Sequence, residues 1–275
     1  TQLPKVAVIG AGSSGITALK ALVERGFDAV AYEASDRVGG NWVIDNKNGM
    51  SAAYTSLHIN TSKPMMEYRD FPMPAHYPDF PHHTNIAEYF DHYVEQFGLR
   101  DRIRFETKVA HAERGDDGIW SLTDDKGDIE RFDALVVANG HHWDPRWPEP
   151  AFPGSETFKG EQMHAHAYRD SSQLAGKKVV VLGMGNSAMD IAVEGSYAAE
   201  KVYLAARRGA YIVPKYFFGR PLDQVLKNDP RIPFKIRQKA FELALRTQIG
   251  KVEDYGLPKP DHRFAEAHPT VSDPI

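Results

Sequence analysis

The sequence has no cysteine among its 275 residues. This absence excludes structural disulfides, thiolate zinc sites and any redox centre built on a Cys-X-X-Cys pair. The sequence also has no uninterrupted apolar run long enough to cross a bilayer. No basic-then-apolar signal peptide precedes the apolar run that begins at Val6. We therefore expect a soluble protein of the cytoplasm, without a membrane segment in this chain.

The sequence also has no excess of positively charged residues. The 33 Lys and Arg residues are outnumbered by 37 Asp and Glu, which gives a formal net charge of -4. Such a chain has no broad positive field along which nucleic-acid phosphates could bind, and this argues against general nucleic-acid binding.

Two stretches of the chain repeat one glycine-rich pattern. Residues 6–19 read VAVIGAGSSGITAL, and residues 179–192 read VVVLGMGNSAMDIA. Each has an apolar run, then small residues at Gly-X-Gly-X-X-Gly/Ala spacing, then a helical pattern. We call these stretches the first and second fingerprints. They predict two strand–helix–strand units, and hence an α/β fold with two Rossmann-like dinucleotide-binding domains.

The first fingerprint predicts a site for a dinucleotide without a 2′-phosphate. Gly10 permits the tight turn, Gly12 lets a pyrophosphate approach the backbone, and Gly15 lets the helix pack closely on the strand. Ser14 lies in the same turn. Glu33 ends the following strand, where a carboxylate accepts hydrogen bonds from a ribose diol.

The second fingerprint predicts a site for NADP. Its next strand ends in Arg207 and Arg208, whose guanidinium groups can bind the 2′-phosphate that a carboxylate would repel. Two different dinucleotides in one chain suggest that NADPH passes hydride to a flavin, so we assign FAD to the first fingerprint. The candidate NADP-binding residues of the second turn are Gly183, Gly185, Asn186, Ser187 and Ala188.

The rest of the chain divides into shorter elements. A proline-dense stretch at residues 141–154 predicts a linker, so we expect an FAD-binding domain over residues 1–150 and a linker with an NADPH-binding domain over residues 151–275. The tail after residue 254 shows no clear element. Helices are expected at 14–25, 84–97 (with Thr84 as N-cap) and 186–199, an amphipathic segment at 233–249, and strands at 5–10, 28–32, 103–109, 119–123, 131–138, 177–182 and 201–206.

Several motifs in order resemble one known family. Phe158, Gly160, His164 and Tyr168 fill the F-X-G-X-X-X-H-X-X-X-Y/W signature of class B flavoprotein monooxygenases. GGNW at residues 39–42, NTSK at 60–63 and ANGHHWDPRWP also match. Over essentially its whole length, the chain resembles the flavin-containing monooxygenases, which are related to the Baeyer–Villiger monooxygenases.

This resemblance implies a chemistry and a set of residues. NADPH would reduce FAD, O2 would form a C4a-hydroperoxyflavin, and one oxygen would pass to a small soft nucleophile. Asn60 matches the active-site asparagine of the family, while Gly39, Gly40 and Trp42 would line the flavin. Tyr168 favours oxygenation of an amine nitrogen or a sulfide sulfur over Baeyer–Villiger oxidation of a ketone.

Other interpretations remain open from the sequence. They are a flavin NADPH oxidase that releases H2O2 and a non-catalytic dinucleotide-binding fragment. A disulfide reductase is excluded because it needs a cysteine pair. The close histidine pairs, such as His82 with His83, do not predict a metal site. Family members are normally longer, so we expect a C-terminal part to be missing, and a homodimer is possible within the family.

Overall fold

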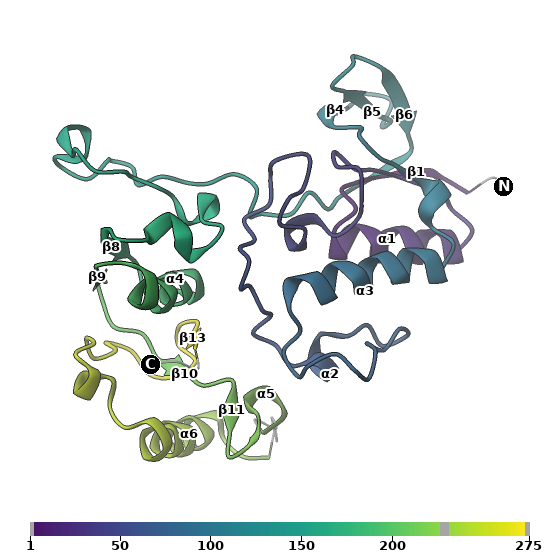
Figure 1. Ribbon diagram of the computed structural model, residues 1–275. Helices are drawn as coiled ribbons and strands as arrows, with labels where there is room; N and C mark the ends of the chain where they lie inside the picture. The colour runs from purple at the N-terminus through teal and green to yellow at the C-terminus, as the bar shows by residue number, and fades with distance from the viewer. Residues whose placement is uncertain (1–2, 226–230, 273–275) are drawn as a thin grey trace. The chain divides into compact units, whose positions relative to one another are not determined.

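The computed structural model describes residues 3–225 and 231–272. Its contacts divide the chain into two units, which we treat separately (Figure 1). Unit 1 takes in the chain up to His58 together with Tyr68–Tyr77 and Pro81–Arg169. Unit 2 takes in Ile59–Glu67, Pro78–Phe80 and the chain from Asp170 onward.

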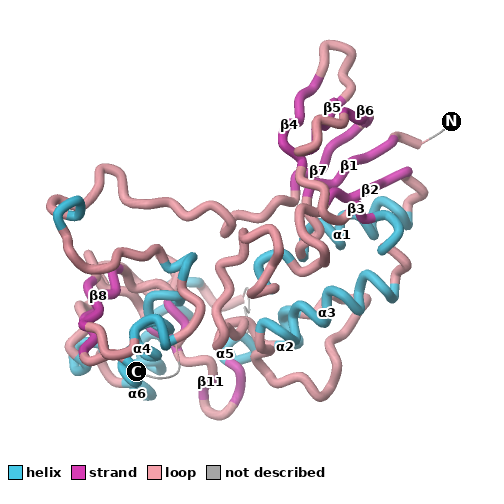
Figure 2. Tube along the Cα trace, turned by 45° about the horizontal axis from the view of Figure 1, so that its top comes forward, coloured by secondary structure: helices cyan, strands magenta, loops and turns pink. Residues whose placement is uncertain are grey.

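Unit 1 is built on a parallel sheet. Its strand order is β3-β2-β1-β7, and the helix α1 (Ser13–Glu24) connects β1 to β2, as the first fingerprint predicts. Figure 2 shows the strands side by side. Their bounds are β1 Lys5–Ile9, β2 Asp28–Tyr32, β3 Ile103–Arg104 and β7 Ala134–Val137.

Both faces of this sheet are covered, as a parallel sheet requires. On one face lies α1, with α3 (His83–Gln96) beside it. The other face packs against an antiparallel sheet of β4 (Val109–Arg114), β5 (Trp120–Asp124) and β6 (Ile129–Phe132). The core between the two sheets contains the buried residues Ala7, Tyr32, Leu122 and Phe132.

Unit 2 contains a second, smaller strand–helix–strand motif. The parallel strands β8 (Lys178–Leu182) and β9 (Lys201–Ala205) are joined by α4 (Asn186–Ala198). The other α-helices and strands in the described part of unit 2 are α2 Lys63–Met66, β10 Ile212–Val213, β11 Tyr216–Phe217, β12 Arg220–Pro221, α5 Leu222–Val225, α6 Phe234–Ile249 and β13 Thr270–Val271. The amphipathic segment noted at residues 233–249 forms the helix α6.

The structure corrects two predicted strands. The strand predicted at 103–109 is two strands, because Glu106 adopts φ 51° and turns the chain between β3 and β4. The strand predicted at 131–138 is also two strands, β6 and β7. Asp133 separates them, since its N–H donates to the carbonyl of Lys5 and its carboxylate accepts from the Lys5 N–H.

Two smaller predictions are also wrong. His82, not Thr84, is the N-cap of α3, and its side chain accepts a hydrogen bond from the Thr84 N–H. The tail was expected to have no element, yet β13 pairs in parallel with β10. A strand of two residues has no periodicity, so only its pairing partner defines it.

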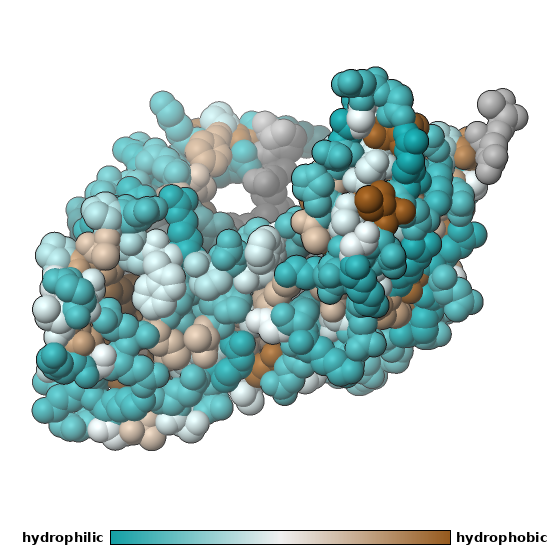
Figure 3. All heavy atoms as spheres, turned by 90° about the horizontal axis from the view of Figure 1, so that it is seen from above, coloured by the Kyte–Doolittle hydropathy of each residue, from teal (hydrophilic) through white to brown (hydrophobic). Residues whose placement is uncertain are grey.

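The surface shown in Figure 3 is mostly hydrophilic, and its hydrophobic atoms lie in small separate groups. Across residues 3–225 and 231–272, no helix combines the length and the apolar character needed to span a bilayer.

One ionic cluster joins the two sheets of unit 1. Glu130 on β6 accepts hydrogen bonds from Lys5 Nζ and from the Tyr32 hydroxyl, both at 2.6 Å, and it also pairs with Arg104. Partial burial acts to raise the pKa of Glu130, but the hydrogen bonds from Arg104, Lys5 and Tyr32 outweigh it and lower that pKa to about 2.

The cluster predicts an acid-dependent contribution to stability. A free glutamate has a pKa of about 4.3, so the stabilisation from Glu130 is complete above that pH and is lost as the pH falls toward 2. Glu130→Gln should lower the free energy of unfolding at pH 7 by about 1 kcal/mol, a small value because solvent screens partly exposed ions. The variant should also lose less stability than the wild type on acidification. Urea titrations across this pH range measure both effects, with the exposed Glu156→Gln as control; equal acid profiles for Glu130→Gln and wild type would contradict the assignment.

Candidate functional site

The first fingerprint forms a turn that only glycine permits at two positions. Gly10 adopts φ +98°, and a Cβ built on it would lie 2.5 Å from the carbonyl oxygen of Ala138. A Cβ on Gly15 would lie 1.9 Å from the carbonyl oxygen of Gly10. The turn from β1 into α1 therefore needs glycine at positions 10 and 15 for reasons of packing alone.

Gly12 is different, because packing within the protein does not require it. A Cβ at Gly12 would have Gly40 Cα as its nearest neighbour, at 3.8 Å, which is ordinary contact. The GGNW segment lies against this turn, with the Gly39 N–H donating to the Ala11 carbonyl at 3.3 Å and Trp42 ending the short helix η1 (Gly40–Trp42). The turn and this segment thus meet through glycine backbone, and a Cβ on Gly40 would lie only 3.3 Å from Gly12 Cα.

Glu33 holds the turn from the end of β2. Its side chain is buried, and its two oxygens accept hydrogen bonds of 2.8 Å from the backbone N–H groups of Ala11 and Ser35. A carboxylate oxygen has a second lone pair, so Glu33 can also accept a hydrogen bond from a ribose hydroxyl. The residues of this turn therefore fit the adenosine part of FAD.

Both fingerprint helices begin without a side-chain cap. Gly12 is the N-cap of α1 and Gly185 the N-cap of α4, and neither helix has an acidic residue in its first turn. Their first N–H groups therefore lack a side-chain acceptor, and together with the helix dipole they can bind an anion. Ser14 and Ser187 are exposed in the first turns of α1 and α4.

The second fingerprint lines a cavity of about 370 Å³, a size that suits a small-molecule ligand. Gly183 adopts φ +125°, and the Ala188 Cβ lies against it. Among residues 3–225 and 231–272, no atom lies within 4 Å of a Cβ built on Gly185, which itself lines the cavity. Arg207 and Arg208, both exposed after β9, line the same cavity.

The C-terminal segment completes this cavity, which the sequence did not indicate. His262 and His268 line it, and His262 Nδ1 lies 3.0 Å from the carboxylate of Asp261. The pKa of Asp261 lies below its usual range, mainly because of the hydrogen bond with the His262 side chain. The positive charge of Arg208 lowers it further. These residues are more than fifty positions from Arg208 in the chain, and long-range contacts bring them together, among them the β10–β13 pairing and a bridge between Gly209 and Pro260.

The structure uses Asn186 within the protein. Its Oδ1 accepts a hydrogen bond of 2.9 Å from the Val271 N–H, and the Thr270 hydroxyl donates to the Met184 carbonyl at 2.5 Å. The side chain of Asn186 and the backbone of Met184 therefore attach the C-terminal segment to the fingerprint turn.

The signature residues of the linker do not form one cluster. The Phe158 ring is 60% exposed and packs against Gly160. A Cβ on Gly160 would lie 2.6 Å from that ring, so only glycine at position 160 allows this ring position. His164 accepts a hydrogen bond from the His166 N–H and lies beside Trp147, with ring centroids 5.9 Å apart. Tyr168 is fully buried against Tyr54, in the core of unit 1.

Asn60 lies half-buried in the segment Ile59–Glu67, which belongs to unit 2. His82 and His83, the pair considered as metal ligands, contact the carbonyls of Thr55 and Trp42. The described part of the chain holds no group of three or more His, Asp or Glu side chains placed to bind a metal ion.

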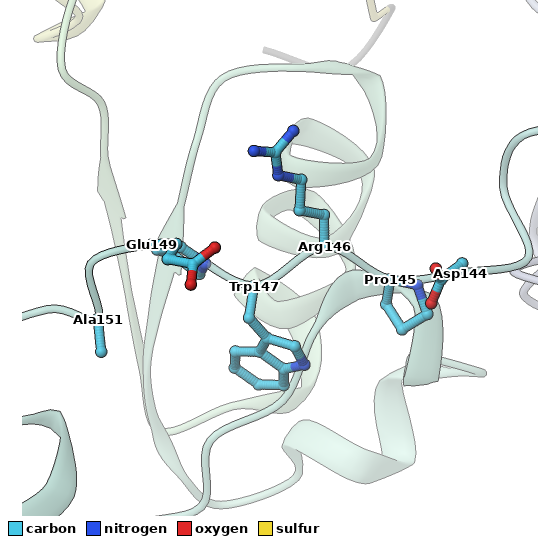
Figure 4. A pocket seen from close by; sticks show the side chains of 7 residues that line it. Asp144, Pro145, Arg146, Trp147, Glu149 and Ala151 are labelled. Carbon is cyan, nitrogen blue, oxygen red and sulfur yellow. The ribbon is translucent and has the colours of Figure 1, made fainter.

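A larger hollow of about 670 Å³ lies along the linker, lined by residues 144–149 and 151 (Figure 4). Arg146 and Trp147 point in opposite directions there. A ligand site gathers groups from several elements around one space. This hollow is lined by one loop and by none of the predicted site residues, so we assign it no role.

Comparison with known proteins identifies the family of the chain. Residues 3–275 match the family described as flavin-binding monooxygenase-like. Rat flavin-containing monooxygenase 5 is 37% identical over 98% of this chain and 54% of its own length. Rabbit dimethylaniline monooxygenase [N-oxide-forming] 2 is 34% identical over 98% of this chain and 53% of its own length.

Solved structures give the same result. S-allyl-L-cysteine S-oxygenase from Allium sativum has a TM-score of 0.68 and 29% identity, covering 74% of this chain and 51% of that one. Cyclohexanone monooxygenase from Rhodococcus sp. Phi1 bound to NADP+ has a TM-score of 0.63 and 29% identity, covering 80% of this chain and 41% of that one.

The chain belongs to the flavin-binding monooxygenase-like family. FAD and NADPH are the cofactors of that family. The chain spans about half the length of the curated relatives it matches, 54% for the rat protein.

The contacts around the glycines predict that alanine lowers stability at position 15 but not at positions 12 and 185. Gly15→Ala should lower the free energy of unfolding by about 3 kcal/mol, because its Cβ has no space beside Gly10. Gly12→Ala and Gly185→Ala should unfold at the wild-type temperature, since nothing in the protein crowds either Cβ. Thermal unfolding without added cofactor measures the difference; equal losses at positions 12 and 15 would show that Gly12 is also a packing residue.

Proposed function

We propose that the protein is an NADPH- and O2-dependent FAD monooxygenase. It oxygenates a soft nucleophile, an amine nitrogen or a sulfide sulfur, with Baeyer–Villiger oxidation of a ketone as the alternative substrate class. When bound, the flavin reduced by NADPH supplies the activation of O2. The contribution of the protein is to bind, orient and shield the reacting groups.

The observation that carries this proposal is a contrast of charge between two similar turns. A buried carboxylate, Glu33, closes the first turn, and two exposed guanidinium groups, Arg207 and Arg208, close the second. A 2′-phosphate is repelled by the carboxylate and attracted by the guanidinium groups. The first turn therefore suits FAD and the second suits NADPH.

The proposal assigns a role to each site. The domain at residues 1–150 holds FAD through the α1 N-terminus, Glu33 and the segment at Gly39, Gly40 and Trp42. The domain at residues 151–275 holds NADPH through the α4 N-terminus and the two arginines. Asn60 directs its side-chain amide toward the reacting groups and NADP+.

The substrate class is supported by relatives of three kinds. One relative forms N-oxides from dimethylaniline by its name, and another is an S-oxygenase of S-allyl-L-cysteine. A third, cyclohexanone monooxygenase, is named for a ketone. Nitrogen and sulfur nucleophiles come first in our proposal because the signature of this chain ends in Tyr168.

A stoichiometry measurement tests the activity. NADPH consumption, oxygenated product and released H2O2 are followed with a tertiary amine, a thioether and a cyclic ketone in turn. The proposal expects one product per NADPH for the amine or the thioether. Peroxide in place of product with all three would instead identify an NADPH oxidase, and failure to retain FAD would identify a non-catalytic dinucleotide-binding protein.

The arginine pair predicts a change in cofactor preference. Arg207→Ala combined with Arg208→Ala removes two charged hydrogen-bond donors from the proposed 2′-phosphate site, each worth about 1.5–3 kcal/mol. Affinity for NADPH should fall on the order of 100-fold or more, while affinity for NADH should change little. Isothermal titration with both nucleotides measures this, with the exposed Arg246→Ala of the same unit as control. An unchanged NADPH to NADH preference would remove the NADP assignment.

A further inference from the structure

The segment that carries Asn60 is held by α5. Ser62, two residues after Asn60, is fully buried, and its N–H donates a hydrogen bond of 2.7 Å to Asp223 Oδ2. The Ser62 hydroxyl accepts a second hydrogen bond, of 3.2 Å, from Gln224 Nε2. Both the backbone and the side chain of Ser62 are thus bound by consecutive residues of one short helix.

The next residue of the same segment, Lys63, is held by a second contact. The N–H of Lys63 donates to the Asp79 carbonyl at 2.7 Å, and the Asp79 carboxylate accepts from the Tyr216 hydroxyl at 3.1 Å. The Phe80 ring meets the Tyr216 ring edge to face, with centroids 5.2 Å apart. These contacts explain why residues 59–67 and 78–80 belong to unit 2, although unit 1 residues flank them in the sequence.

A contribution to stability does not by itself explain an aspartate at position 223. Its second oxygen, Oδ1, is buried and makes no hydrogen bond to any described residue. A buried carboxylate oxygen without a partner lowers stability. An apolar residue at this position would avoid that cost, but it would release the Ser62 N–H.

We propose that Asp223, assisted by Gln224, is a positioning residue that fixes Asn60 by holding Ser62. It acts on the backbone and touches neither cofactor nor substrate. The unit with the second fingerprint therefore sets the orientation of the Asn60 amide. This inference rests on the proposed function, because it takes Asn60 as the group placed beside the reaction.

Hydrogen–deuterium exchange tests the anchor without turnover. Asp223→Ala should raise deuterium uptake in the peptide that covers residues 59–67, and leave peptides covering β8, α4 and β9 unchanged. Asp223→Asn keeps an acceptor oxygen for the Ser62 N–H, so it should restore the wild-type uptake. Asp125→Ala, an exposed aspartate in the turn after β5, is the matched control. Wild-type uptake at residues 59–67 in Asp223→Ala would overturn the proposal.

A milder variant covers the case in which Asp223→Ala unfolds unit 2. Gln224→Ala removes only the hydrogen bond to the Ser62 hydroxyl, and it should raise uptake in the same peptide by a smaller amount. If deuterium uptake at residues 59–67 stays at the wild-type level in Gln224→Ala, the proposal that α5 holds Ser62 is overturned.

Turnover then tests positioning. Asp223→Ala should lower substrate oxygenation per NADPH on the order of ten-fold and release the remainder as H2O2, with the Kd for NADPH changed less than about two-fold. Asp223→Asn should behave as wild type. Raised exchange with unchanged oxygenation would overturn the positioning role. If Asn60→Ala leaves oxygenation unchanged, the proposed role of Asn60 beside the reaction fails. The exchange experiment still tests whether Asp223 holds Ser62.

Discussion

Both fingerprint helices begin at a glycine N-cap, Gly12 in α1 and Gly185 in α4, and the rest of both sites depends on this constraint. Because glycine has no side chain, the first N–H groups of α1 and α4 have no side-chain acceptor on the N-cap residue. In unit 1 the strand and the helix also lie so close that a Cβ on Gly15 would meet the Gly10 carbonyl at 1.9 Å. Each helix N-terminus can therefore bind an anion, such as the pyrophosphate of a dinucleotide.

The two turns differ in what stabilises them around that shared geometry. In unit 1 a buried carboxylate, Glu33, binds the Ala11 N–H and holds the turn to β2. In unit 2 the equivalent strand end carries exposed arginines, and the C-terminal segment holds the turn instead, through Thr270 and Val271. The first turn is thus completed by a neighbouring strand, while the second depends on residues some eighty positions further along the chain.

Local patterns explain which parts of the fold could be predicted. The spacing of small residues and the apolar runs gave β1, α1 and β2 nearly to the residue, and β8, α4 and β9 equally well. The prediction of one strand over 131–138 was wrong because Asp133 binds Lys5, a contact that no local pattern contains. The pairing of β13 with β10 and the attachment of Ser62 to Asp223 are likewise long-range hydrogen bonds.

The sequence alone determined that two dinucleotide turns exist and that opposite charges close them, because strand, turn, helix and the next strand end lie within about thirty residues of chain. Only the tertiary structure decided that the Asn60 segment joins the unit with the second fingerprint, and that the residues around His262 complete the second cavity. Such choices depend on which distant donor meets which acceptor, and residue periodicity carries no information about that pairing.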